Sequence, residues 1–302
     1  MQRLHNPLAG AVLALATVLA AGCESATFGL ANRGLAPPDA TAIYAPEFGL
    51  ALDIYRPHDA AAGPAPTVVF FYGGAWQRGE RAQYQFIGRR LAQNGMLAIV
   101  ADYRTWPAAT FPGFVSDGAR AIAWSHAHAG EYGGDPQQLF IAGHSAGAQI
   151  AGLLGTDPRH LGQVGLSLDQ IDGVIGLSGP YDFAIGGPYR KIFGAPAQWP
   201  QTQAINYVDG DEPPFLLIHG ADDRRVEARD SMLMAEKLRA NHVPAQLLIL
   251  PDTGHGAPLW RLHDPKRSPA VLSAVLEFVR EPHGATALSG RGVATEDGAS
   301  AD

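Results

Sequence analysis

The chain has 302 residues, of which 46% are hydrophobic and 17% are charged, and its 22 Lys and Arg against 29 Asp and Glu give a formal net charge of −7. So many apolar residues can bury a large core, which excludes the intrinsically disordered class, and a mildly acidic surface does not favour nucleic acid as a partner. The single cysteine, Cys23, excludes an intramolecular disulfide and a cysteine-based zinc site. The length fits one large domain or two small ones.

The chain opens with an apolar segment. Arg3 precedes a run of mainly apolar residues at 8–21, which is shorter than the about 20 residues of a transmembrane helix and is typical of an export signal. Leu19 to Cys23 resemble a bacterial lipobox. This resemblance implies cleavage before Cys23, a lipid on its thiol, and an exported protein anchored in the bacterial cell envelope, at the outer membrane or facing the periplasm. The alternatives are an ordinary cleaved signal with an incidental cysteine, or an apolar segment without function.

Composition predicts four regions along the chain. Residues 1–22 are expected to be the signal, and residues 23–43 are expected to form a flexible tether. Within the tether, residues 25–39 are rich in Gly, Ala and Pro and show no periodicity. Residues 44–283 are expected to form one folded domain, which carries the candidate site residues described below. Residues 284–302 have a composition similar to the tether and are expected to be a disordered tail.

Within the predicted domain, short apolar runs alternate with amphipathic helical patterns. Residues 50, 52 and 54 alternate with small or polar neighbours, which predicts a half-exposed strand. The later runs are continuously apolar, as in strands that are covered on both faces; they comprise residues 68–72, 97–101, 139–142, 174–177, 215–218 and 247–250. Helical patterns occupy 82–93, 115–128, 228–240 and 269–280. The alternation predicts an α/β fold with a mostly parallel central sheet, helices on both faces, and a site at the carboxyl ends of the strands.

The run at 68–72 leads into Gly73, Gly74, Ala75 and Trp76. Glycines at this point let backbone N–H groups face a site without obstruction by side chains. Such groups stabilise the negative charge of a tetrahedral intermediate. Gly73 and Gly74 are therefore candidate donors of an oxyanion hole.

The run at 139–142 leads into Gly143-His144-Ser145-Ala146-Gly147 and then into a helical pattern at 148–154. This is the pattern of a nucleophile elbow, a sharp turn that exposes the Oγ atom of Ser145 above the sheet. The flanking glycines allow strained torsions and close packing of helix on strand. Ser145 is thus the candidate nucleophile, and the N–H of Ala146 is a third candidate oxyanion donor.

The connection at 181–213 is long and carries several aromatic residues. Its length and composition predict a small lid insertion between the strands near 174–178 and 214–219. Candidate residues of a substrate pocket are Tyr181 in this segment and Trp76, Trp106, Phe111 and Trp260, which follow strand ends or the predicted histidine loop. The alternative for each is an aromatic core beneath long loops.

A serine nucleophile needs a histidine to accept its proton and a buried carboxylate to orient that histidine. His255 follows the last predicted strand, and both Asp222 and Asp223 follow the strand at 215–218. Asp223 is favoured because hydrolases of this type often read His-Gly-x-x-Asp-x-x-Val, a pattern that His219 to Val226 resemble. Asp222 is the alternative.

In combination, Tyr72 to Trp76, residues 102–104, residues 143–147 and residues 179–182 resemble carboxylesterases of the α/β-hydrolase fold. The resemblance is to the hormone-sensitive-lipase-like group, within it to the branch of feruloyl/acetylxylan esterase-like and prenylcysteine methylesterase-like proteins, and it covers about residues 45–282. One departure is that the first motif of this group usually opens with His, where this chain has Tyr72. The role of that His in bracing the loop is therefore unassigned here.

The resemblance implies hydrolysis of small carboxylic esters by the triad Ser145, His255 and Asp223 through an acyl-enzyme, without a cofactor or a metal. Two alternatives remain open. One is an amide hydrolase of the arylformamidase or small-peptidase type, which uses the same triad, and the other is a non-catalytic envelope binding module on a hydrolase scaffold.

Overall fold

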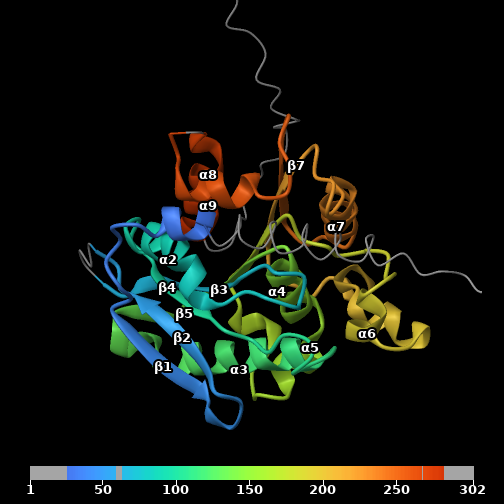
Figure 1. Cartoon of the computed structure of the whole chain (residues 1–302), viewed down its shortest axis with the longest axis horizontal. Helices are drawn as coiled ribbons and strands as arrows, with labels where there is room; N and C mark the ends of the chain where they lie inside the picture. Colours follow the sequence, from blue (N-terminus) through green and yellow to red (C-terminus); the bar gives the residue numbers. More distant parts are fainter. Residues whose placement is uncertain (1–25, 59–62, 267, 282–302) are drawn as a thin grey trace, which may run out of the picture.

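An eight-stranded sheet forms the centre of the molecule, with the strand order β1-β2-β4-β3-β5-β6-β7-β8 (Figure 1). The computed structural model describes residues 26–58, 63–266 and 268–281. The strands are β1 (Ala40–Ala45), β2 (Leu50–Tyr55), β3 (Ala65–Phe71), β4 (Leu97–Ala101), β5 (Gly134–His144), β6 (Gly173–Leu177), β7 (Phe215–Gly220) and β8 (Ala245–Leu250). β2 runs antiparallel to β1 and β4, whereas every other neighbouring pair is parallel. The predicted α/β fold with a mostly parallel sheet is confirmed.

Helices cover both faces of this sheet. On one face α2 (Gln85–Ala92) packs against α8 (Ala257–His263), which packs against α9 (Pro269–Arg280). On the other face α3 (Gly113–His128) packs against α4 (Ala146–Thr156) and α5 (Pro158–Gly162), while α7 (Ala228–Ala240) lies beside β7 and β8 (Figure 1). Every residue of α4 is buried, because this helix lies against β5 and β6 and beneath α3. The core therefore extends on both sides of the strand that leads into Ser145.

The environment of β2 differs from the prediction of a half-exposed strand. All six of its residues are buried, because β1 and β4 flank it and α2 covers it. The polar residue that produced the apparent alternation, Asp53, accepts hydrogen bonds from Thr41 Oγ1 at 2.7 Å and Arg81 Nε at 3.0 Å. A buried carboxylate with these partners is compatible with a strand inside the sheet.

The connection between β6 and β7 carries α6 (Tyr189–Phe193) and two 3₁₀ helices, η5 (Pro196–Thr202) and η6 (Ala204–Tyr207). This is the place predicted for a small insertion. Because β6 and β7 are parallel neighbours, the insertion begins at the carboxyl edge of the sheet, where the candidate catalytic residues also lie.

The segment before β1 also differs from the prediction. Residues 26–43 were expected to belong to a flexible tether, but residues 26–31 form a helix and β1 begins at Ala40. In Figure 1 this blue helix lies between α2 and the α8–α9 pair. The folded domain thus begins before the predicted boundary at residue 44, because specific side-chain contacts, described below, hold this segment in place.

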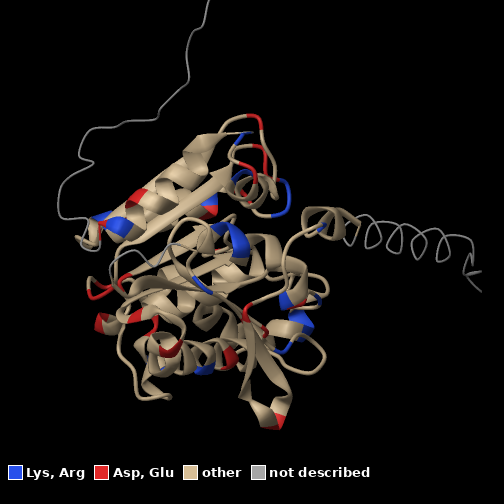
Figure 2. Ribbon diagram, turned by 90° about the vertical axis from the view of Figure 1, so that its left-hand side faces the viewer, with Lys and Arg blue, Asp and Glu red and all other residues tan. Residues whose placement is uncertain are grey.

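Several predictions fall on residues 1–25 and 282–302, which are outside the described residues; they include the signal, Cys23 and the tail. No helix among the described residues is long and apolar enough to span a bilayer. Figure 2 shows basic and acidic residues on separate short stretches of ribbon, and most of the ribbon carries neither. This distribution agrees with the low charged fraction of 17%.

Candidate active site

Ser145 lies in the sharp turn between β5 and α4, at a φ of 54°. Two glycines make this turn possible. A Cβ atom on Gly143 would lie 2.2 Å from the carbonyl oxygen of Gly147, and one on Gly147 would lie 2.1 Å from that of Phe71. Larger residues cannot occupy these positions without moving the backbone, so the Gly-x-Ser-x-Gly pattern is required by the contact of helix and strand. The N–H of Ser145 donates to the carbonyl of Leu177 at 2.9 Å, which ties the turn to β6.

Three predicted residues meet above the carboxyl edge of the sheet. Ser145 Oγ lies 2.8 Å from His255 Nε2, and His255 Nδ1 lies 2.7 Å from Asp223 Oδ2. With Nδ1–H donating to the carboxylate, Nε2 is free to accept the proton of the serine hydroxyl. The side chain of Asp223 is fully buried, whereas Asp222 is exposed to solvent and makes no contact with His255 among the hydrogen bonds of the described chain. Of the two carboxylates considered, the structure thus brings Asp223 to the histidine.

The carboxylate of Asp223 is held by groups beyond His255. Its Oδ1 accepts from the N–H groups of Arg225 at 2.8 Å and Val226 at 3.0 Å, and its Oδ2 accepts from His219 Nε2 at 3.1 Å. Burial by itself would raise the pKa of Asp223, but the hydrogen bonds from His219 and His255 outweigh burial and hold the pKa well below its usual range. Asp223 is therefore ionised and oriented. His219 in turn accepts from Ser231 Oγ at 2.7 Å, which fixes its ring.

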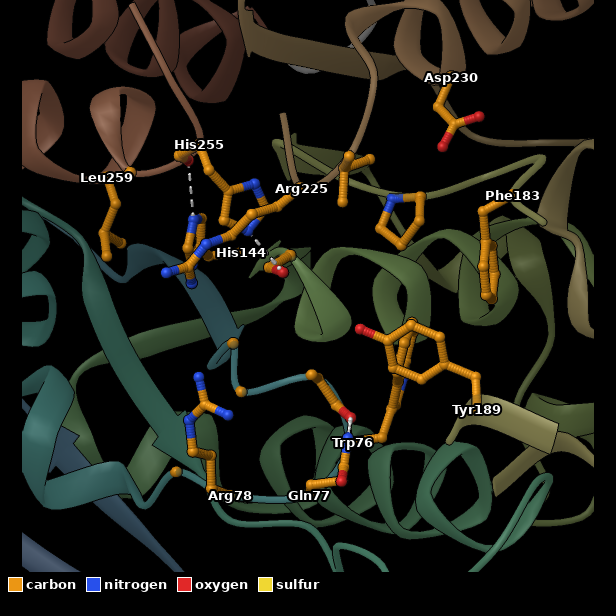
Figure 3. A pocket seen from close by; sticks show the side chains of 18 of the residues that line it. Trp76, Gln77, Arg78, His144, Phe183, Tyr189, Arg225, Asp230, His255 and Leu259 are labelled. Atoms are coloured by element: carbon orange, nitrogen blue, oxygen red, sulfur yellow. Dashed lines mark hydrogen bonds between the residues drawn. The ribbon is translucent and has the colours of Figure 1, made fainter. Parts of the chain in front are cut away.

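The backbone of His255 is fixed as firmly as its ring. Its carbonyl oxygen accepts from His144 Nε2 at 3.2 Å (Figure 3). It also accepts from Ser178 Oγ at 3.0 Å. Burial, together with the nearby His255, lowers the pKa of His144 to about 3, so His144 stays neutral and donates through Nε2–H. These two contacts hold the loop that aims His255 at Ser145. The roles of His144 and Ser178 were not predicted, because both side chains act on a carbonyl that is distant in the chain. The role of His219 was not predicted either, although its partners Asp223 and Ser231 are close to it in the sequence.

The loop that follows β3 supplies the other side of the site. The N–H of Gly73, predicted as an oxyanion donor, instead donates to the hydroxyl of Tyr84 at 3.2 Å. The carbonyl of the same peptide unit, that of Tyr72, accepts from Tyr103 Oη at 2.8 Å. One peptide group is thus held at both polar ends by two buried tyrosines. The assignment of Gly73 as a donor is corrected by this geometry, because its N–H already has an acceptor.

Three other backbone N–H groups next to the site have no internal acceptor in the described part of the chain: Gly74 and Ala75 line the pocket, and Ala146 directly follows Ser145. Within the described residues, no hydrogen bond uses the N–H of Gly74, Ala75 or Ala146 as a donor. Gly74 has a φ of 147°, and a Cβ atom there would lie 1.9 Å from the carbonyl oxygen of Arg78, so the tight loop requires glycine. Ala75 follows with a φ of 54°. Gly74 and Ala146 were predicted as oxyanion donors. Ala75 is a further candidate that was not predicted, because nothing in the local sequence indicates its positive φ.

A pocket of about 1170 Å³ opens over Ser145 and His255. Trp76, Phe183 and Tyr189 form an aromatic part of its wall. The centroid of the Trp76 ring lies 5.4 Å from that of Phe183 and 5.7 Å from that of Tyr189. Trp76 is fixed because its Nε1–H donates to Gln149 Oε1 at 3.1 Å. In Figure 3 this aromatic group lies on one side of His255 and Leu259 lies on the other. An ester carbonyl at Ser145 would therefore have a wall on each side.

The predicted pocket residues divide into two groups. Trp76 and Trp260 line the pocket, but Trp106, Phe111 and Tyr181 do not. Tyr181 is fully buried, with its ring against Gly152 and Gly179. The backbone N–H of Trp106 donates to the carbonyl of Trp76 at 2.7 Å, so Trp106 braces the wall from behind. Position after a strand end therefore did not distinguish wall residues from supporting ones.

No group of three or more His, Cys, Asp or Glu side chains that could hold a metal ion occurs among the described residues. The chemistry available to the described site is that of an ionised Asp223, an imidazole, a hydroxyl and backbone amides. Such a set can activate a serine and stabilise an oxyanion.

Comparison with known proteins shows relatives with this architecture. The sequence model of the BD-FAE family matches residues 52–238. Among curated proteins, the chain is 32% identical over 253 residues to "Esterase LipC" of Mycobacterium tuberculosis, covering 77% of this chain and 62% of the relative. It is 34% identical over 226 residues to "Probable isoprenylcysteine alpha-carbonyl methylesterase ICME" of Oryza sativa subsp. japonica, covering 68% of this chain and 54% of the relative. The chain thus spans little more than half the length of these relatives.

Among solved structures, the apo form of Thermogutta terrifontis esterase 2 matches with a TM-score of 0.69 and 26% identity, covering 80% of this chain and 94% of the other. The same esterase phosphorylated by paraoxon matches with a TM-score of 0.68 and 25% identity, covering 80% and 93%. Here the match extends over nearly the whole of the related chain.

Proposed function

The chain belongs to the BD-FAE family of α/β-hydrolase esterases, and from this premise we propose that it is a carboxylesterase that cleaves small carboxylic esters through an acyl-enzyme on Ser145. The observation that carries the proposal is the continuous contact from Ser145 Oγ to His255 Nε2 at 2.8 Å and from His255 Nδ1 to Asp223 Oδ2 at 2.7 Å. Each group has the neighbours that its role requires, since Asp223 is kept ionised and the carbonyl of His255 is held by two donors.

The first half of the reaction forms the acyl-enzyme. Ser145 Oγ attacks the ester carbonyl carbon while His255 Nε2 takes the hydroxyl proton, and the electron pair of the carbonyl moves to its oxygen. The N–H groups of Gly74, Ala75 and Ala146 stabilise that oxyanion, and ionised Asp223 stabilises the protonated imidazole. The intermediate then collapses as the bond to the alkoxy group breaks and His255 returns its proton to the leaving alcohol.

The second half repeats these steps with water. His255 takes a proton from a water molecule, which attacks the acyl carbon, and the second oxyanion collapses with release of Ser145 Oγ. His255 then returns the proton to the serine, which leaves a free carboxylic acid and the starting enzyme.

The test compares a matched ester and amide. The protein should hydrolyse p-nitrophenyl butyrate and cleave butyric p-nitroanilide far more slowly, because its relatives are esterases. The anilide is included because amide hydrolases use the same triad, so the triad alone does not separate the two activities. Substitution of Ser145 by Ala should reduce ester cleavage by about a thousandfold or more with an unchanged circular dichroism spectrum. Faster cleavage of the anilide would favour the amide-hydrolase alternative, and no cleavage of either compound would favour the binding module.

We also propose that the mature protein is anchored in the bacterial cell envelope by a lipid on Cys23. Support comes from the sequence alone: Cys23 is the only cysteine, and it ends the lipobox-like Leu19-Ala20-Ala21-Gly22-Cys23 after an apolar run. Cells that express the full chain with radiolabelled palmitate should label the protein, and Cys23→Ala should abolish the label. Persistent label in that variant would refute the anchor without affecting the proposed esterase activity.

A further inference from the structure

The segment at 26–39, expected to be a tether, is attached to the domain by specific side-chain contacts. Asn32 Nδ2 donates to the carbonyls of Ala82 at 3.0 Å and Gln83 at 3.1 Å, while its Oδ1 accepts from the N–H of Phe86 at 3.0 Å. Asn32 thus satisfies a backbone donor in the first turn of α2, a group that a helix cannot satisfy internally. The contact fixes the chain next to residues 26–31, which form the N-terminal helix.

A second attachment follows nearer to β1. Arg89, a buried residue of α2, donates through Nε to the carbonyl of Ala36 at 3.2 Å and through Nη1 to Asp39 Oδ2 at 2.9 Å. It also donates to the carbonyl of Pro37. Because the buried guanidinium takes its partners from this segment, displacement of the segment would leave a buried charge without compensation. The segment is therefore part of the folded domain.

The N-terminal helix places Phe28 in the wall of the substrate pocket. The centroid of the Phe28 ring lies 5.0 Å from that of Tyr84 and 5.6 Å from that of Trp260. Phe28, Tyr84 and Trp260 all line the pocket and come from the N-terminal helix, η2 (Arg81–Tyr84) and α8 respectively. They form a second aromatic wall, in addition to that of Trp76, Phe183 and Tyr189. Phe28 lies outside residues 52–238, the part that matches the family.

Both walls are apolar, and each has a different origin in the chain. The wall of Trp76 comes from the loop after β3 and the insertion between β6 and β7, whereas Phe28 comes from the N-terminal helix and Trp260 from α8. An ester at Ser145 has two arms, the acyl group and the alcohol. An aromatic wall favours an arm that can bury apolar area against it.

We propose that the N-terminal helix is a specificity element of the site, and that Phe28 selects esters whose acyl group and alcohol both carry an apolar portion. The inference rests on the proposed ester hydrolysis and adds the substrate class. An ester with one small arm leaves the wall of Phe28 unused. An ester with apolar arms on both sides of the carbonyl buries one against Trp76 and the other against Phe28 and Trp260.

The test uses four esters that combine a small or an apolar acyl group with a small or an apolar alcohol: methyl acetate, methyl hexanoate, benzyl acetate and benzyl hexanoate. In wild-type protein, kcat/KM should be highest for benzyl hexanoate. Phe28→Ala should lower kcat/KM for benzyl hexanoate by about tenfold relative to methyl acetate, which is the scale of discrimination by a few apolar carbons in a pocket. Since the result is a ratio of two substrates in one preparation, it does not depend on the fraction of folded enzyme.

Leu30→Ala is the matched control, because Leu30 belongs to the same helix, is 70% exposed and does not line the pocket. This variant should keep the wild-type ratio, and Phe28→Leu, which retains an apolar side chain, should recover most of it. An equal effect of Phe28→Ala on all four esters, or the same ratio change in Leu30→Ala, would overturn the inference while ester hydrolysis stands. If the wild-type protein cleaves none of the four esters or p-nitrophenyl butyrate, the proposed function and this inference both fall.

Discussion

The peptide group between Tyr72 and Gly73 shows how single hydroxyls can determine the geometry of the site. Its carbonyl accepts from Tyr103 Oη at 2.8 Å, and its N–H donates to Tyr84 Oη at 3.2 Å. The rings of Tyr72 and Tyr103 are also stacked, with centroids 4.6 Å apart. These contacts fix the orientation of the peptide group that precedes the candidate oxyanion donors Gly74 and Ala75. Related proteins usually have a His at the position of Tyr72. In this chain the hydroxyls of Tyr103 and Tyr84 hold the start of the loop instead.

Tyr84→Phe should therefore slow the chemical step more than it weakens substrate binding. Loss of the acceptor frees the N–H of Gly73 and loosens the loop that carries Gly74 and Ala75, and one hydrogen bond of this kind corresponds to a decrease in kcat of about five- to tenfold. KM should change by less than about twofold, because the ring and its apolar contacts remain. The measurement is steady-state kinetics on p-nitrophenyl butyrate.

Tyr55→Phe provides the control for the loss of a buried tyrosine hydroxyl. Tyr55 is fully buried under α2, and its Oη has no hydrogen-bond partner among the described residues. Its kcat should match that of the wild type. A similar decrease in both variants, or a change in KM alone for Tyr84→Phe, would contradict a positioning role for the Tyr84 hydroxyl.

At the scale of residues, sequence analysis found the groups that react but not the groups that hold them. Ser145, Asp223 and His255 follow strand ends in motifs with a fixed chain order, so their meeting could be anticipated from topology. His144 and Ser178 act on the distant carbonyl of His255, and Tyr84 acts on Gly73 from across a loop; residues of these types are common in any fold. Nothing in the local sequence distinguishes the hydroxyl of Tyr84, which holds Gly73, from that of Tyr55, which holds nothing in the described structure.

At the scale of elements, Asp230 joins the first turn of α7 to the insertion after β6. It is 6% exposed and accepts a hydrogen bond from the backbone N–H of Asp182. Burial, and then the charges of Asp182 and Glu227, raise its pKa from 3.8 to about 7, although the Asp182 N–H and Arg229 act in the opposite direction. Protonation of Asp230 removes the cost of burying its charge and the repulsion from Asp182 and Glu227, so the folded protein is most stable when Asp230 is protonated.

This shift makes a prediction about stability and pH. Between about pH 4 and pH 7 the folded protein retains the proton of Asp230 that the unfolded chain releases, so the free energy of unfolding decreases as pH rises through this window. Asp230→Asn, which keeps an acceptor for the Asp182 N–H and carries no charge, should remove this contribution. The free energy of unfolding of the variant minus that of the wild type should therefore be larger at pH 8 than at pH 5, by about 1–3 kcal/mol.

Urea unfolding at pH 5 and pH 8 measures this difference. Asp211→Asn is the matched control, because Asp211 is an exposed acid near β7, and it should show the same difference from wild type at both pH values. Equal differences for Asp230→Asn at the two pH values would show that the ionisation of Asp230 is not linked to folding.

The elements were predictable where their own sequence determines them. The parallel strands β3 to β8 contain the apolar runs, since strands covered on both faces are apolar throughout. β1 was missed because its alternating sequence lies in a stretch assigned to the tether, and it leaves Ile43 64% exposed. β2 was expected to be half exposed because it contains the polar Asp53. The partner that allows Asp53 to be buried, Arg81, comes from η2, and the sequence of β2 does not reveal it.

At the scale of the whole molecule, the N-terminal helix and α8, which are more than 200 residues apart in the chain, meet beside the site. The N-terminal helix contacts α8 through Phe28 and Trp260, and α8 packs against the C-terminal α9. Composition predicted the Gly-, Ala- and Pro-rich segment at 25–39 to be a tether, but a few polar contacts from Asn32 and Arg89 suffice to dock it. Ala26 follows Cys23 by three residues, a span of at most about 10 Å. A lipid on Cys23, as proposed, would therefore hold the pocket wall close to a membrane surface.

The central claim is that Ser145 is the nucleophile of a serine esterase, and covalent labelling tests it most directly. Paraoxon carries an electrophilic phosphorus that an activated serine attacks with release of p-nitrophenol. The protein should release one equivalent of p-nitrophenol, lose its activity towards p-nitrophenyl butyrate in proportion, and carry one diethylphosphoryl group on the peptide that contains Ser145, as located by mass spectrometry. Ser145→Ala should show none of these changes. A diethylphosphoryl group on another residue with full loss of activity, or an unmodified Ser145 in an inactivated protein, would contradict the account.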